Sequence, residues 1–456
     1  SLDSLAIEFP FKTQTAELWC PQEYVASQVG RAPAEKHVSQ PSSQLRIGDA
    51  ERGIQFSQNA VQRQLVPEGD TYRLRYDFVE KPLQLGSKPV ASFRLTWQGL
   101  PVKPRSPLYR RIHIDDALWT TDVEEQPFHI TPVYTEGWNR HWNYHNFWNR
   151  EVFEEEFVEK IKKKIRDDWN RDRKTFSMYM NIATFDANTP EYRRYRFEWV
   201  GDQAEYFAPD PSRRDEVKQV MINSEESSFL DFYMWHINKT IRYLTDDGQI
   251  PIHCYLDNTV ANRKYMLRLW RVVKGINPHN QIIAHMSGDN AMHAYGFADW
   301  LVEGEENTAS YLNRRAADPS LPKNYTRILN LDMVRARYSP FAFGDKFLLY
   351  QFWVWKNDSP AREHLWGLLA VHDGTTWAAS GPGRFKKELT EFGWDDRIRF
   401  VPYWRSGTGI KVTSDVQPVV ASGWTRGPQE LLLLVVNDSD RQARVALTVD
   451  GARFGY

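Results

Sequence analysis

The chain has 456 residues, a length that predicts two to four domains rather than one core. It has 58 Lys and Arg against 59 Asp and Glu, so the formal net charge is −1 and no global field attracts nucleic acid or an anionic membrane. The basic run 160–164 is interleaved with acidic and apolar residues, as on a solvated helix face. No stretch approaches the roughly 20 apolar residues of a membrane span.

The first 107 residues have the pattern of a β-domain. Residues 72–80 and 91–99 alternate apolar and polar side chains, as strands with one buried face do. The segment 33–43 is rich in Pro, Ser and Ala and indicates a long loop, and the Pro-rich segment 101–107 ends the region. We therefore expect an N-terminal β-sandwich over residues 1–107.

Residues 108–395 alternate strand-like runs with long amphipathic helices. Apolar residues of the helix expected at 151–169 recur at i+4 spacing. Repeated alternation over this length predicts a parallel sheet and fits a TIM-like (β/α)8 barrel. An open, doubly wound sheet is the alternative, although no G-x-G-x-x-G or Walker loop is present. The expected strands lie at 128–134, 175–182, 250–257, 281–287, 298–304 and 346–355, and further helices at 228–244 and 262–276.

Past residue 395 the helical pattern stops. Residues 430–440 and 442–451 are apolar, alternating runs that predict a hairpin in a small C-terminal β-domain over residues 396–456. The expected fold class is α/β, a (β/α)8 barrel flanked by an N-terminal β-sandwich and a small C-terminal β-domain.

The chemistry of such a barrel belongs at the carboxyl ends of its strands. Asp257 follows one buried strand, and Glu303 and Glu305 follow another. Glycosidic cleavage needs two carboxyl groups flanking the bond, so we predict Asp257 and Glu305 as the catalytic pair. Two other interpretations stay open: Asp257 as the N-cap of the next helix, and residues 303–306 as a solvated loop.

Aromatic and imidazole side chains are dense near the same predicted edge. Indole rings stack on the apolar faces of sugars, and the chain has 18 Trp. No H-E-x-x-H or G-x-S-x-G motif occurs, so neither a metal nor a Ser/His/Asp site is predicted, and no cofactor is expected. The predicted substrate-binding residues are Trp138, His141, Trp142, Tyr255, His285, Glu303, Trp353 and Trp355.

Four short motifs resemble a bacterial group of uncharacterised glycoside-hydrolase-like proteins distantly related to glycoside hydrolase family 123. They are "LTWQGLPVKP", "YLDNT", "FADWLVEGEE" and "RIRFVPYW". The resemblance implies the same three-part architecture. Family 123 enzymes are β-N-acetylgalactosaminidases that use an Asp-Glu pair and the acetamido group of the substrate. This chain has Asp257-Asn258 at the matching position, so the acid comes from elsewhere, with Glu305 our choice, or the activity differs.

The sequence therefore predicts a glycoside hydrolase that cleaves a complex glycan or polysaccharide. Glu305 is the expected general acid/base, and Asp257 the nucleophile, base or oxocarbenium stabiliser. A non-catalytic glycan-binding protein on a hydrolase scaffold and a polysaccharide lyase with a Tyr or His base are the alternatives. A carbohydrate is the expected partner, without nucleic acid or a membrane span. The expected location is the periplasm or exterior of a bacterium, and the oligomeric state is left open.

Overall fold

The structure, a computed structural model, divides into two compact units. Unit 1 comprises Ser1–Ser106, Gly304–Thr376 and Arg397–Tyr456, and unit 2 comprises Pro107–Glu303 and Trp377–Asp396. The residues described are 1–21, 30–39, 44–84, 86, 92–103, 129–133, 155–172, 174–181, 184–186, 190–199, 206–207, 219–221, 228–257, 263–285, 296–303, 320, 329–337, 341, 346–350, 359–377, 388, 391–392, 397–427 and 429–455.

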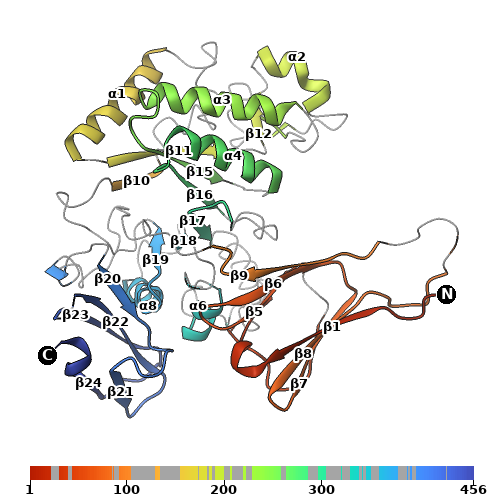
Figure 1. Ribbon diagram of the computed structural model, residues 1–456, viewed down its shortest axis with the longest axis vertical. Coiled ribbons are helices and arrows are strands. Elements are labelled where there is room, and N and C mark those ends of the chain that lie inside the picture. The colour runs from red at the N-terminus through yellow and green to blue at the C-terminus, as the bar shows by residue number, and fades with distance from the viewer. Residues whose placement is uncertain are drawn as a thin grey trace. The chain divides into compact units, whose positions relative to one another are not determined.

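Two antiparallel sheets form the N-terminal part of unit 1 (Figure 1). Their orders are β1-β8-β7-β4 and β3-β2-β5-β6-β9. Both sheets contribute to one apolar core, in which Trp19, Phe56 and Tyr76 are buried, so the predicted β-sandwich is present. The strands are β1 (Ala6–Lys12), β2 (Leu18–Pro21), β3 (Gly30–Arg31), β4 (His37–Ser39), β5 (Gln44–Gly48), β6 (Gly53–Gln58), β7 (Gln62–Glu68), β8 (Thr71–Asp77) and β9 (Leu95–Leu100).

The C-terminal part of unit 1 is a β-domain of two small antiparallel sheets. β22 (Val419–Arg426) lies between β20 (Ile398–Val401) and β23 (Leu431–Asn437), and β21 (Ile410–Ser414) pairs with β24 (Val445–Val449). The predicted hairpin is therefore wrong, because its two strands, β23 and β24, belong to different sheets. Local alternation sets where strands form, but the partner of each strand depends on the rest of the domain.

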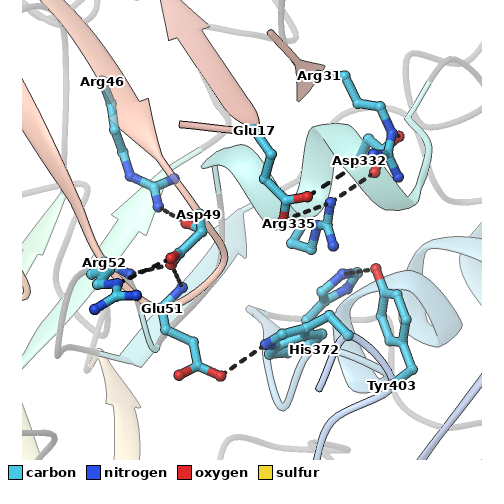
Figure 2. A network of polar contacts seen from close by, with 11 residues as sticks. Glu17, Arg31, Arg46, Asp49, Glu51, Arg52, Asp332, Arg335, His372 and Tyr403 are labelled. Atoms are coloured by element: carbon cyan, nitrogen blue, oxygen red, sulfur yellow. Dashed lines mark hydrogen bonds and ion pairs between the residues drawn. The ribbon is translucent and has the colours of Figure 1, made fainter. Parts of the chain in front are cut away.

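Helix α6 (Leu331–Arg337) packs on β2 and β3 and ties the sandwich to the later chain (Figure 2). The side chain of Arg335 is 6% exposed, and its Nη2 atom lies 3.2 Å from Glu17 Oε1 and 3.3 Å from Asp332 Oδ1. Arg31 closes the cluster, with Nε 2.8 Å from Asp332 Oδ2. The ion pairs Arg335–Glu17 and Arg31–Asp332 thus join α6 to the sandwich.

A second set of contacts joins the sandwich to the C-terminal domain (Figure 2). Glu51 accepts hydrogen bonds from Trp404 Nε1 at 3.1 Å and from Arg405 Nη2 at 2.9 Å. Nearby, His372 is fully buried, and its Nε2 lies 3.0 Å from the Tyr403 hydroxyl. His372 follows α8 (Ser359–Ala370). Unit 1 is therefore one body built from three separate parts of the sequence.

Unit 2 is built on a parallel sheet whose spatial order equals its chain order. The strands are β10 (His129–Val133), β11 (Lys174–Asn181), β15 (Ile252–Asp257), β16 (Gln281–His285) and β17 (Trp300–Glu303), each paired with the next. A (β/α) barrel has this order, whereas a doubly wound sheet reverses direction. Within the described residues, no later strand of the sheet pairs with β10, so the predicted closed barrel is not shown. Strands β18 (Lys346–Tyr350) and β19 (Thr375–Trp377) follow along the chain.

Amphipathic helices pack against this sheet (Figure 1). Tyr233 of α3 and Tyr265 of α4 are buried, with ring centroids 6.0 Å apart, and Cys254 of β15 is buried as well. Burial raises the pKa of the Cys254 thiol to about 12, which makes it an inert core group. The helices are α1 (Glu155–Asp172), α2 (Pro190–Trp199), α3 (Phe229–Leu244) and α4 (Arg263–Ile276).

A small antiparallel sheet, β12 (Thr184–Asp186), β14 (Gln219–Met221) and β13 (Tyr206–Phe207), completes the described part of unit 2. Among the described helices, none has the length and apolar character to cross a membrane.

Candidate functional site

Three of the predicted site residues end three neighbouring parallel strands. Asp257 is the last residue of β15, His285 of β16 and Glu303 of β17. The backbone register pairs Asp257 with Asn181 and His285 with Val302. Neighbouring strands lie about 4.8 Å apart, so the ends of β15 and β17 are separated by roughly 10 Å. One edge of the sheet therefore carries these positions together.

Tyr255 and His285 form a buried polar pair at this edge. The Tyr255 hydroxyl lies 2.9 Å from His285 Nδ1, and the ring centroids are 6.0 Å apart. Both side chains are buried. The hydrogen bond links β15 to β16 and fixes the orientation of the imidazole ring. Residues two apart on a strand share a face, so position 257 lies on the face that carries Tyr255.

A layer of polar side chains lies toward the amino ends of the same strands. The backbone N–H of Gln281 donates to His253 Nδ1 at 3.0 Å, which leaves Nδ1 without a proton. Nε2 therefore carries the hydrogen, and it donates to Thr175 Oγ1 at 2.7 Å. The Trp300 indole N–H donates to the side-chain oxygen of Gln281. The layer crosses β11, β15, β16 and β17 on one face.

His253 is held neutral in this layer. Burial, with a smaller effect of Lys274, lowers the pKa of His253 to about 3. A neutral imidazole with two hydrogen bonds at the amino ends of the strands has a structural role. In a barrel-type sheet, the reacting groups belong at the opposite, carboxyl ends of the strands. The sequence analysis missed this layer, although its signal is visible as the polar residues His253 and Gln281 inside apolar strands.

Six of the predicted residues lie outside the described residues. Of Asp257 and Glu303 only the backbone is described. The register of position 303 differs from that of positions 257 and 285. Val302 pairs with His285, so position 303 is one residue out of phase with the row through 257 and 285. Within the described residues, no group of three or more His, Cys, Asp or Glu is arranged to hold a metal ion. The six are Glu305, Trp138, His141, Trp142, Trp353 and Trp355.

No family model and no curated protein matches the chain. Several solved structures do, and these neighbours are glycoside hydrolases. A cyclomaltodextrinase is 10% identical over 95% of this chain and 88% of its own, with a TM-score of 0.44. The noncanonic maltogenic alpha-amylase AmyB of Thermotoga neapolitana is 12% identical over 61% and 68%, with a TM-score of 0.38. The GH36 alpha-galactosidase AgaA of Geobacillus stearothermophilus is 10% identical over 98% and 76%, with a TM-score of 0.38. The resemblance to family 123 stays a prediction.

Proposed function

We propose that the protein is a glycoside hydrolase that cleaves a glycosidic bond in a complex glycan. One observation carries the proposal: Asp257 ends β15 in the register row that continues toward His285, at the edge of the sheet where β17 also ends. Reactive groups of barrel-type sheets belong at this edge. Asp257 is proposed as nucleophile, base or oxocarbenium stabiliser, and Glu305 as general acid/base.

The strand spacing suits a pair of carboxyl groups on either side of one bond. The ends of β15 and β17 are roughly 10 Å apart. Carboxyl groups about 5–5.5 Å apart retain the anomeric configuration, and groups about 6.5–9.5 Å apart invert it.

The decisive experiment compares Asp257→Asn with the unchanged chain on a panel of aryl glycosides and oligosaccharides. Loss of the carboxylate is expected to lower kcat at least 100-fold. Asp231→Asn is the matched control, since the Asp231 side chain is 71% exposed on α3 and far from the strand ends in sequence. Both variants are expected to melt at the temperature of the unchanged chain. Full turnover by Asp257→Asn would remove Asp257 from the mechanism.

A second candidate is a polysaccharide lyase. The hydrogen-bonded Tyr255–His285 pair favours it, because a lyase uses a Tyr or His side chain as the base that removes a proton from a uronate. Acidic polysaccharides are the substrates for this test, with absorbance of an unsaturated uronate product as the readout. The lyase would be supported if acidic polysaccharides give this absorbance while neutral glycans release no reducing ends. Binding of glycans without any product would instead indicate a non-catalytic glycan-binding protein.

A further inference from the structure

The C-terminal β-domain contains a hollow that is separate from the strand ends of unit 2. It has a volume of about 360 Å³ and lies between the end of β20, the turn that follows, the end of β22 and the 3-10 helix η9 (Gly451–Phe454). Its polar side is formed by Arg405, Ser406, Thr408, Thr425 and Arg453. Cationic and hydroxyl groups gathered in one concave place are typical of a site for a polar ligand.

Two glycines shape the wall of this hollow. Gly407 and Gly409 have φ of 66° and 82°, in the left-handed region that favours glycine. A Cβ atom at Gly409 would lie 2.9 Å from Arg453 Cδ and 3.1 Å from Phe454 Cε2. One at Gly407 would lie 3.7 Å from Arg453 Nη1. The turn therefore comes into close contact with the Arg453 side chain, and a larger residue at 409 would push that side chain away.

The two arginines of the hollow differ in charge balance. Arg405 is paired with Glu51 through its Nε and Nη2 atoms, one on each carboxylate oxygen, so its charge is compensated. Within the described residues, the Arg453 guanidinium has neither a hydrogen bond nor an ion pair, and the preceding Asp450 bonds to Arg453 only through the backbone. The hollow thus has one uncompensated positive charge, which favours an anionic ligand.

The volume of the hollow and its other lining residues indicate which class of anionic ligand fits. A volume of about 360 Å³ lies at the small end of small-molecule pockets, and a bare oxyanion would leave most of it to water. The planar guanidinium fork of Arg453 matches a carboxylate. Hydroxyl groups of Ser406 and Thr425 suit sugar hydroxyls, and Phe400 and Phe454 provide an apolar side. We infer that this pocket binds a uronic-acid residue, with its carboxylate on Arg453.

Titration calorimetry of the full chain with D-glucuronate, D-galacturonate, D-glucose and acetate tests the inference. At least one uronate is expected to bind, with glucose and acetate at least tenfold weaker. Arg453→Gln is expected to weaken uronate binding more than tenfold, because a charge-assisted hydrogen bond is lost. Arg441→Gln, at another exposed arginine of the same domain, is the matched control and is expected to bind normally. Thr425→Val is a second variant, with a several-fold weaker affinity expected.

The inference is independent of the proposed hydrolysis, and Asp257→Asn separates the two. Uronate binding that survives this variant and is lost in Arg453→Gln belongs to the C-terminal pocket. Three results would overturn the inference: no binding of either uronate, equal affinity in Arg453→Gln, or acetate as tight as the uronates. Because Arg453 is exposed, its variant is expected to keep the melting temperature of the unchanged chain, which circular dichroism checks.

Discussion

At the scale of single residues, buried polar groups divide by their position along the strands. His253 lies at the amino end of β15 with both ring nitrogens engaged by neighbouring strands. His285 ends β16 with Nδ1 on Tyr255. Both histidines are buried, yet only the second lies at the edge where the sheet presents Asp257. Position along the strand, rather than residue type, separates a structural group from a candidate functional group.

Tyr255→Phe tests whether Tyr255 positions His285. The variant removes the hydroxyl that contacts Nδ1, and we expect kcat to fall about tenfold, the equivalent of one lost hydrogen bond. Tyr243→Phe is the control, since the Tyr243 hydroxyl contacts Glu159 on the helical surface. An unchanged rate in Tyr255→Phe would contradict the positioning role.

His253 makes the stability of unit 2 sensitive to acid. Its pKa falls from 6.5 to about 3 on folding, so the unfolded chain takes up the proton first as the pH drops. The contribution is complete above pH 6.5 and is lost progressively toward pH 3. Urea titrations at pH 7 and pH 5 are expected to show that His253→Asn loses about 2 kcal/mol less than the unchanged chain on acidification. His279→Asn, on the exposed surface, is expected to lose as much as the unchanged chain.

At the scale of elements, the helices of unit 2 follow the pattern of their apolar residues. Helix α3 buries a continuous stripe that includes Tyr233, Ile237 and Leu244, while Trp235 and Lys239 lie on the opposite, exposed face. The sequence pattern was enough to predict this helix. The pairing of strands in the C-terminal domain could not be predicted in this way, because alternation indicates that a strand forms but not which strand it pairs with.

Ile237→Ala tests the buried stripe of α3. Ile237 is fully buried, so the truncation is expected to lower the free energy of unfolding by about 2–5 kcal/mol. Lys239→Ala, two residues later on the exposed face, is expected to change it by less than about 0.5 kcal/mol. Denaturant titration measures both. A loss of similar size in the two variants would contradict the assignment of the faces.

At the scale of the whole molecule, the first and last thirds of the sequence meet in unit 1. Ion pairs form part of the contacts: Arg335 reaches Glu17, and Arg405 reaches Glu51. The cluster around Arg335 is balanced within the unit, since Arg335 lies beside Glu17 and Asp332, and Arg31 pairs with Asp332 (Figure 2). Hence this cluster supports the fold and is not a binding site for a further ion.

Arg335→Ala tests this cluster. The side chain is 6% exposed, and its loss leaves the carboxylates of Glu17 and Asp332, which are 35% and 33% exposed, with fewer partners. We therefore expect unit 1 to lose about 1–3 kcal/mol. Hydrogen exchange read by peptide is expected to rise in β2, β5 and α6 and to stay constant in α3 and α4. Arg52→Ala, whose side chain is 69% exposed beside Asp49, is expected to leave exchange unchanged. A uniform rise over both units would contradict the assignment.

The sequence by itself determined the kinds of element and their order. Alternation at 72–80 indicated β8, the period of α3 was visible, and Asp257 was placed at the end of a buried strand, because these features depend on local periodicity. Only the tertiary structure decided which strands pair, as for β23 and β24, and that position 303 is out of phase with 285. It also brought Thr175, His253 and Gln281 together. Register and partners join residues distant in the chain, and no local pattern encodes the hydrogen bonds between them.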